Sequence, residues 1–436
     1  MARRISRREF IGTAAAATMA GRMTAGGATP PNIIFILADD LGYGDLSCYG
    51  RPDYQTPALD GLARQGLKFM SAYAAAPVCT PTRCALATGR YPQRLEVGLR
   101  EPLKSRTEEI DIGLPADHPT VASRLKAAGY DTALVGKWHL GWKPEFGPNR
   151  HGYDEFFGIL SGAADYFTHS ADLWENLTPV ARVGYLTDLL SDRAASYVLR
   201  PRTKPFFLSL HYTAPHAPWE GPEDAAIGHT DHGGGPMTNG GSLKIYSAMM
   251  KSMDAGIGRV LRALARARLE RNTLVIFTSD NGGERYSYNW PFSFQKGYLW
   301  EGGLRVPAIV RWPGVVPAGR STDQAAVTMD WAATLLAAGG ATPDPAYPLD
   351  GEDLMPVCSG ARAPYDRSLY WRTIEREAAR AGKWKYLKDS GDELLFDLSV
   401  DPGEKTDLRA AHPDVFARIK QQYTAWSAQM LPRPRE

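Results

Sequence analysis

The sequence predicts an α/β protein, because short apolar runs alternate along the chain with segments of helical periodicity. Four of these runs are followed at once by polar side chains, and in open α/β sheets a site forms beyond the carboxyl ends of the strands. The 436 residues are 44% hydrophobic and 22% charged, which is enough apolar mass for a large core. A net charge of +2 gives no electrostatic footprint for nucleic acid, so we expect no nucleic-acid partner.

The first thirty residues predict an export signal. Residues 6–11, Ser-Arg-Arg-Glu-Phe-Ile, form a twin-arginine pattern, and a weakly apolar, alanine-rich run follows it. This run is shorter than the ~20 apolar residues that cross a bilayer, so we expect no permanent membrane anchor. We expect residues 1–30 to be a twin-arginine signal peptide and the product to be periplasmic or secreted; the alternative is a disordered basic tail.

Two apolar runs end in side chains that suit a metal ion. The run 32–38 has the continuous apolar character of a buried central strand, and so has the run 273–279. Adjacent strand residues point to opposite faces, so two consecutive carboxylates reach one ion only if the strand has already ended. Carboxylate and amide oxygens favour Ca²⁺ or Mg²⁺ over zinc, although such residues also cap helices. The candidate ligands are Asp39, Asp40, Asp280 and Asn281.

The stretch 79–89, Cys-Thr-Pro-Thr-Arg-Cys-Ala-Leu-Ala-Thr-Gly, predicts a helix with a reactive side chain at its start. We expect Pro81 at the first helical position and Thr80 as the capping residue. The free N–H groups and the helix dipole then make a site for a tetrahedral oxyanion beside Cys79. Arg83 lies about one turn further on and can reach back toward it.

The four cysteines are too few for a disulfide scaffold, so we expect little dependence on disulfides. Cys84 and Arg90 have the spacing of a thiolate phosphatase loop, which offers a second interpretation of this region. The residues between them include good helix formers where such a loop needs glycines to wrap around phosphate. We therefore disfavour the phosphatase loop.

Two further runs lead into basic side chains. The run 131–135 precedes Lys137 and His139, which are two residues apart and project to the same side. The run 205–210 leads to His216, whose neighbouring prolines rigidify its backbone and suit a positioned acid. A lone histidine is more often structural, so the interpretation of His216 depends on its companions.

The segment around Lys296, Gln-Lys-Gly, precedes Glu-Gly-Gly at 301–303. A lysine is usually a solvated surface residue, which is the plain alternative here. Just before it, the segment 286–292 carries several aromatic side chains that suit stacking on a sugar or aryl ring, or packing within a surface loop.

Several of these segments together resemble the sulfatase family. The stretch 79–89 has every fixed position of the sulfatase signature, Cys, x-Pro-x-Arg, four residues and Thr-Gly. Gly-Lys-Trp-His-Leu-Gly at 136–141, the Glu-Gly-Gly block and the segment 394–404 also resemble family elements. The small polar residues that the family often has before Glu-Gly-Gly are replaced here by Leu-Trp.

The resemblance implies an alkaline-phosphatase-like α/β/α sandwich around a large mixed sheet, with a small C-terminal antiparallel-sheet subdomain. We expect the catalytic domain over residues 31–365 and the C-terminal subdomain over 366–436. The family implies one Ca²⁺ ion, with Mg²⁺ as the alternative. It also implies that a formylglycine-generating enzyme converts Cys79 to formylglycine, which hydrates to two geminal hydroxyls.

The implied function is hydrolysis of aryl or carbohydrate sulfate monoesters. By resemblance, a geminal hydroxyl at position 79 attacks sulfur, cationic groups hold the sulfate oxygens, and a histidine takes the proton that lets sulfate leave. Two alternatives stay open: a phosphonate or phosphate ester hydrolase of the same superfamily, and a sulfated-glycan binding protein with an unmodified thiol. The implied catalytic residues are Cys79, Arg83, Lys137, His139, His216 and Lys296.

Overall fold

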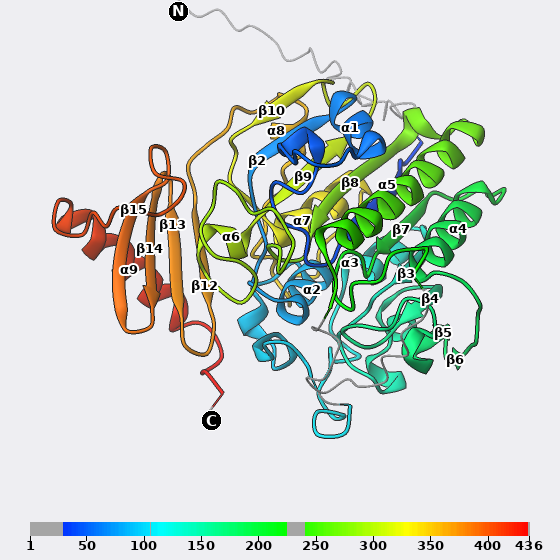
Figure 1. The fold of residues 1–436 in the computed structure, drawn as a ribbon, viewed down its shortest axis with the longest axis horizontal. Coiled ribbons are helices and arrows are strands. Elements are labelled where there is room, and N and C mark those ends of the chain that lie inside the picture. Colours follow the sequence, from blue (N-terminus) through cyan, green and yellow to red (C-terminus); the bar gives the residue numbers. More distant parts are fainter. Residues whose placement is uncertain (1–28, 105, 225–239, 435–436) are drawn as a thin grey trace, which may run out of the picture.

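The structure is a computed structural model that describes residues 29–104, 106–224 and 240–434. The predicted signal segment therefore lies almost entirely outside the described residues. Two sheets organise the rest of the chain, one of eleven strands and one of four (Figure 1). In the described part of the chain, no helix is long and apolar enough to span a membrane.

The large sheet is mixed and has the order β10-β2-β9-β8-β1-β7-β3-β4-β5-β6, with β11 paired to β2. Its five central strands, from β8 to β4, run parallel, whereas β9 is antiparallel to both of its neighbours. The strands are β1 (Asn32–Ala38), β2 (Leu67–Tyr73), β3 (Asp131–Gly136), β4 (Glu155–Ile159), β5 (Leu173–Glu175), β6 (Thr178–Pro179), β7 (Phe206–His211), β8 (Thr273–Ser279), β9 (Arg305–Arg311), β10 (Arg320–Thr322) and β11 (Ala326–Val327).

Helices cover both faces of this sheet, which explains why β1 is apolar without alternation. Ile34 and Ile36 pack into one core with α1, α4 and α5, whereas Ile33 and Phe35 pack into another with α2, α3 and α7. Figure 1 shows α4 and α5 side by side over the first face. The helices are α1 (Pro57–Arg64), α2 (Cys79–Thr88), α3 (Val121–Ala127), α4 (Leu186–Leu199), α5 (Leu243–Arg266), α6 (Glu301–Leu304), α7 (Thr328–Ala338), α8 (Met355–Cys358) and α9 (Pro413–Ser427).

The C-terminal residues form a separate antiparallel sheet at one end of the molecule, with α9 packed on it (Figure 1). Trp371 and Tyr386 of this sheet share a buried cluster with Tyr73 of β2 and Leu304 of α6, so the two sheets are joined by a packed interface. The prediction of a large mixed sheet with a small C-terminal antiparallel sheet is confirmed. The four strands are β12 (Ser368–Arg372), β13 (Glu377–Ala381), β14 (Trp384–Asp389) and β15 (Asp392–Asp397).

Candidate active site

The polar side chains that follow the apolar runs meet at one edge of the large sheet. β8, β1, β7 and β3 are parallel neighbours, so their carboxyl ends lie side by side. α2 begins beside this edge, and the loop between β8 and α6 returns to it. The predicted residues gathered here are Asp39, Asp40, Cys79, Arg83, Lys137, His139, His216, Asp280, Asn281 and Lys296.

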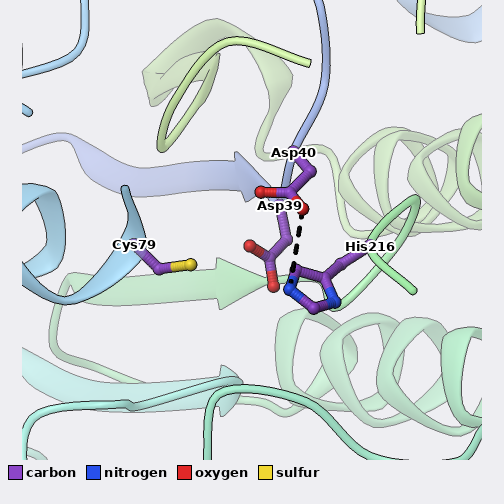
Figure 2. A group of neighbouring side chains, drawn as sticks. All are labelled: Asp39, Asp40, Cys79 and His216. Carbon is purple, nitrogen blue, oxygen red and sulfur yellow. Dashed lines mark ion pairs between the residues drawn. The ribbon is translucent and has the colours of Figure 1, made fainter. Parts of the chain in front are cut away.

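The acidic residues after β1 form the centre of this group. Asp40 has a left-handed φ of 62°, so the chain has left the strand and both consecutive carboxylates can face one space. Figure 2 shows Asp39 and Asp40 with Cys79 and His216, and one ligand atom of each lies within 4.8 Å of the others. Asp39 Oδ1 and Asn281 Oδ1 are buried and accept no hydrogen bond from the described residues. Because such oxygens are costly to bury unpaired, this set fits a hard cation.

Two lysines neutralise these carboxylates, Lys137, which is fully buried, and Lys296, which is partly exposed. Lys137 Nζ lies 2.6 Å from Asp39 Oδ2, and Lys296 Nζ lies 2.6 Å from Asp40 Oδ2. Burial alone would raise the pKa of Asp40, but Lys296, His216 and Lys137 hold it well below its usual range. Burial would lower the pKa of Lys296, and Asp40 raises it well above its usual value. Both lysines are therefore placed to offer positive charge to an anion.

Arg83 joins α2 to the end of β8. Its Nε and Nη2 donate to Asp280 Oδ2 at 3.1 and 2.8 Å, and its Nη1 donates to the Lys137 carbonyl at 2.9 Å. Arg83 thus reaches back across the site as expected, but its direct partner is Asp280. Burial and the charge of Asp39 still raise the pKa of Asp280 to about 7, so a further cation at this carboxylate would be favourable.

The helix that carries Cys79 begins at that residue. Val78, which is extended, precedes it. The expectation that Pro81 is first in the helix and that Thr80 caps it is wrong, because the helix begins two residues earlier than expected. Pro81 takes the third position, where its missing N–H has no intrahelical partner to lose. Gly89, with a φ of 70°, ends the helix as a left-handed residue.

The sulfur of Cys79 is buried, and its surroundings disfavour the thiolate. The residue is 1% exposed, and burial raises its pKa to about 12. Because the thiolate is the nucleophilic and metal-binding form, an unmodified Cys79 suits neither role at neutral pH. Cys84 is buried within the same helix, so its backbone does not form the loop that a thiolate phosphatase needs. All four cysteines are unpaired, in line with the expected lack of disulfides.

His139 has a single assignable tautomer. Its Nε2 lies 2.9 Å from the carbonyl oxygen of Leu103, which can only accept, so Nε2 carries the hydrogen. Burial and the charge of Lys137 lower its pKa well below the usual value, so the ring is neutral and Nδ1 is an acceptor. This Nδ1 is buried without a hydrogen-bond partner among the described residues. Leu103 is fixed in turn, since its N–H donates to Thr80 Oγ1 at 3.1 Å.

His216 and Lys296, the two residues beside Asp40 that could protonate a leaving oxygen, differ in their protonation. His216 Nδ1 lies 2.5 Å from the Ala217 carbonyl and so carries a hydrogen, while Nε2 lies 3.5 Å from Asp40 Oδ2. Burial and the charge of Lys296 lower the pKa of His216 to about 3, which leaves Nε2 unprotonated at neutral pH. Lys296 keeps its proton. Of the two, Lys296 is the better candidate to protonate a leaving oxygen.

Two residues of the site were not predicted from the sequence. Glu284 Oε2 is 3.8 Å from Lys296 Nζ, and burial followed by the charge of Asp40 raises the pKa of Glu284. Leu103 acts through its backbone. A side-chain motif cannot reveal a backbone carbonyl, and Glu284 follows Asp-Asn-Gly-Gly in a loop whose course periodicity does not predict.

A buried acidic cluster ringed by cations, at a helix N-terminus beyond the ends of parallel strands, is an arrangement that suits an enzyme acting on anionic esters. A sulfatase family model matches residues 31–341, and a second model, N-sulphoglucosamine sulphohydrolase, C-terminal, matches residues 288–429. The chain belongs to the sulfatase family, with the alkaline-phosphatase-like fold expected of it. It is a sulfuric ester hydrolase.

Relatives resemble the chain over most of its length. N-acetylgalactosamine-6-sulfatase of Homo sapiens is 34% identical, over 92% of this chain and 86% of that protein. Arylsulfatase A of Homo sapiens is 34% identical, over 90% of this chain and 87% of that protein. The crystal structure of Ps i-CgsB superposes with a TM-score of 0.84 at 32% identity, covering 93% of this chain and 94% of that one.

Proposed function

We propose that this enzyme hydrolyses sulfate esters of carbohydrates with a formylglycine at position 79 and one Ca²⁺ ion. The observation that carries the proposal is the meeting of Cys79 with Asp39, Asp40 and His216, with Lys137 and Lys296 beside them. This arrangement joins a residue whose thiolate is disfavoured to groups that bind a tetrahedral anion.

The modified residue would supply the nucleophile, and the metal would supply a further positive charge, which the other side chains do not provide. The hydrated formylglycine provides two hydroxyls on one carbon, one to accept the sulfuryl group and one whose deprotonation releases it. A bound Ca²⁺ would lower the energy of negative charge on oxygen at this site. Its proposed ligands, all buried oxygen donors, are Asp39, Asp40, Asp280 and Asn281.

The remaining residues bind the sulfate oxygens or transfer protons. Lys137 and Lys296 offer positive charge to the sulfate oxygens, and Arg83 keeps Asp280 aligned at the end of β8. Lys296 gives a proton to the leaving oxygen and regains one from water, which takes the proton of the attacking hydroxyl. His139, neutral with Nδ1 unprotonated, accepts a proton from position 79, and His216 orients the substrate beside Asp40.

The proposed substrate class is a sulfated carbohydrate. One relative is named for N-acetylgalactosamine 6-sulfate chemistry, and Ps i-CgsB, 31% identical, is described in complex with k-i-k-neocarrahexaose. Trp290 of the aromatic segment is 65% exposed and stacked with Tyr288 at a centroid distance of 6.4 Å, which leaves a ring face for a sugar.

Two measurements test the proposed chemistry. The peptide containing Cys79, from protein co-produced with a formylglycine-generating enzyme, is expected to carry an aldehyde that an aldehyde-reactive probe labels. Cys79→Ser, which has one oxygen at that carbon, is expected to trap the sulfated enzyme or to be inactive, with Cys84→Ser as the matched control. Full multiple turnover by Cys79→Ser would refute the two-hydroxyl mechanism.

The substrate class is tested by comparing kcat/KM for sulfated sugars, aryl sulfates and aryl phosphonates. Preference for the phosphonate would support the phosphonate hydrolase alternative, and binding without turnover would support a glycan-binding protein. We further propose export by the twin-arginine route. Detection of Met1 on the mature exported protein would contradict signal removal.

A further inference from the structure

The interface between the two sheets contains a group of buried charges that the proposed chemistry does not use. Lys385 of β14 is fully buried, and its Nζ lies 3.0 Å from Glu301 Oε1 and 2.7 Å from Glu404 Oε1. Glu404 Oε2 accepts the backbone N–H of Glu301 at 2.6 Å. Arg305 and Tyr73 complete the shell around Glu301, at 3.1 and 2.6 Å from Oε2.

Stability alone does not explain these charges. Moving ions out of water is costly, and well-packed apolar side chains in the same volume often stabilise a protein as well or better. Burial alone would raise the pKa of Glu301, but Lys385 and Arg305 hold it down to about 2, so the carboxylate stays ionised. Ion pairs of this kind can instead fix one arrangement among several.

These charges hold the turn Glu301–Gly303, which ends the loop of residues 293–303. Gly302 N–H donates to the Ser293 carbonyl at 2.8 Å, so residues 293–303 form a loop that closes at the start of α6. A Cβ on Gly302 would lie 2.2 Å from the Phe294 carbonyl oxygen, and one on Gly303 would lie 2.1 Å from that of Tyr298. The backbone of the loop therefore rests directly on the Glu301–Gly303 turn.

The C-terminal part of the chain holds the same loop at two other points. Trp300 Nε1 donates to Asp389 Oδ2 at 2.8 Å, and Ser293 Oγ donates to the Gly403 carbonyl at 2.5 Å. Lys405 Nζ also donates to Ser293 Oγ, at 2.9 Å. Both ends of the loop are thus tied to residues that follow β12.

Lys296 stands in the middle of this loop. Its backbone N–H donates to the Gly283 carbonyl at 3.1 Å, and the next residue, Gly297, donates to Pro77 at 2.9 Å, two residues before Cys79. The loop therefore spans from the C-terminal sheet to the segment that carries the reactive residue. A displacement at α6 would move the ammonium group of Lys296 relative to the sulfate site.

We propose that Lys385 and Glu404 are positioning residues, which hold the loop 293–303 so that Lys296 reaches the sulfate ester. The C-terminal sheet is thereby part of the catalytic machinery, although none of its residues touches the reacting atoms. This inference rests on the role proposed above for Lys296. Small displacements of a positioning group cost up to about a hundredfold in rate, which is why such a scaffold matters.

The test is a double-mutant cycle. Glu404→Gln keeps an acceptor for the Glu301 N–H and leaves Lys385 one carboxylate partner, so it is the mildest way to loosen the contact. We expect it to lower kcat/KM for an activated aryl sulfate about tenfold in the wild-type background, and less than about twofold in Lys296→Ala. Trp300→Phe, which loses the bond to Asp389 and keeps an aromatic ring between Phe294 and Phe396, is expected to show the same coupling.

A matched control comes from another buried pair. Asp330 of α7 and Arg367, which precedes β12, lie 2.6 Å apart, and their other side-chain partners are Val327 and Glu352, outside the loop. Asp330→Asn is expected to reduce stability and to act equally in both backgrounds. Equal effects of Glu404→Gln in the two backgrounds would overturn the inference, because they would mean general loosening.

Hydrogen exchange provides a readout that does not depend on turnover. Amides of residues 293–303 are expected to exchange faster in Glu404→Gln, with β1 unchanged. Unchanged exchange in the loop would overturn the positioning role even if activity fell. If Lys296→Ala alone kept full activity, the proposed role of Lys296 would fail, and with it any catalytic meaning of faster exchange.

Discussion

The contact between Thr80 and Leu103 offers the sharpest test of how the site controls its proton transfers. Thr80→Val replaces Oγ1 by a methyl group of similar size and leaves the N–H of Leu103, which is 3% exposed, without its acceptor. A buried unsatisfied donor costs about 1–3 kcal/mol. The segment around Leu103 can move so that this N–H finds another acceptor, and the Leu103 carbonyl then no longer accepts the hydrogen bond from His139 Nε2.

If that cost appears in full as loss of the productive tautomer of His139, activity falls by about 5- to 150-fold, since 1.36 kcal/mol is a factor of ten in rate. The assay is steady-state kinetics with saturating Ca²⁺ over a range of pH. We expect kcat to fall with KM little changed, because His139 acts on the group at position 79 and not on the free substrate.

Two variants control for general damage to the helix. Thr80→Ser keeps the hydroxyl and is expected to restore activity, whereas Thr88→Val removes a comparable buried hydroxyl at the far end of α2, where Oγ1 donates to the Cys84 carbonyl. A kcat for Thr80→Val within about twofold of wild type, or an equal loss in Thr88→Val, would refute the reasoning.

Three other predictions follow from the charges of the described residues. Arg83→Met leaves Asp280 buried without its partner and is expected to lower the free energy of unfolding by about 3–5 kcal/mol, measured by urea denaturation in EDTA. The double variant Arg83→Met, Asp280→Asn should recover much of the lost free energy, and no recovery would argue against direct pairing. Treatment with EDTA is expected to abolish activity and lower the melting temperature, and Ca²⁺ should restore both; full activity after chelation would exclude a required metal. Burial lowers the pKa of His151 to about 4, so the unfolded chain binds a proton at this residue more readily than the folded protein does. This residue should therefore raise the free energy of unfolding by about 3 kcal/mol between pH 4 and 6.5. His151→Gln should reduce the pH dependence of the free energy of unfolding over that range, and an unchanged dependence would contradict the assignment.

Much of the site was predictable because its residues follow strand ends. The apolar runs correspond to β1, β3, β7 and β8, and the side chains predicted to follow these runs lie within a few residues of the strand ends, whereas Arg83 and Lys296 lie elsewhere in the chain. Parallel neighbours bring their carboxyl ends together whatever the loops do, so strand assignment was enough to gather Asp39, Lys137 and Asp280. The roles of these residues in catalysis stay predictions.

Local rules failed where a contact depended on a distant segment. Thr80 was expected to cap its own helix, but it binds Leu103, twenty-three positions away, because α2 begins earlier and its first turn meets another loop. The choice between His216 and Lys296 as proton donor likewise needed the burial of both and their distances to Asp40.

By itself, the sequence determined the α/β class, the helix at Cys79, the acidic strand ends and the resemblance to sulfatases, because periodicity and short motifs are local properties of the chain. Only the tertiary structure decided which lysine meets which carboxylate, which nitrogen of His139 is free, and that Lys385 supports the loop of Lys296. Those features depend on packing between segments up to hundreds of residues apart, and such packing leaves no periodic signal in the sequence.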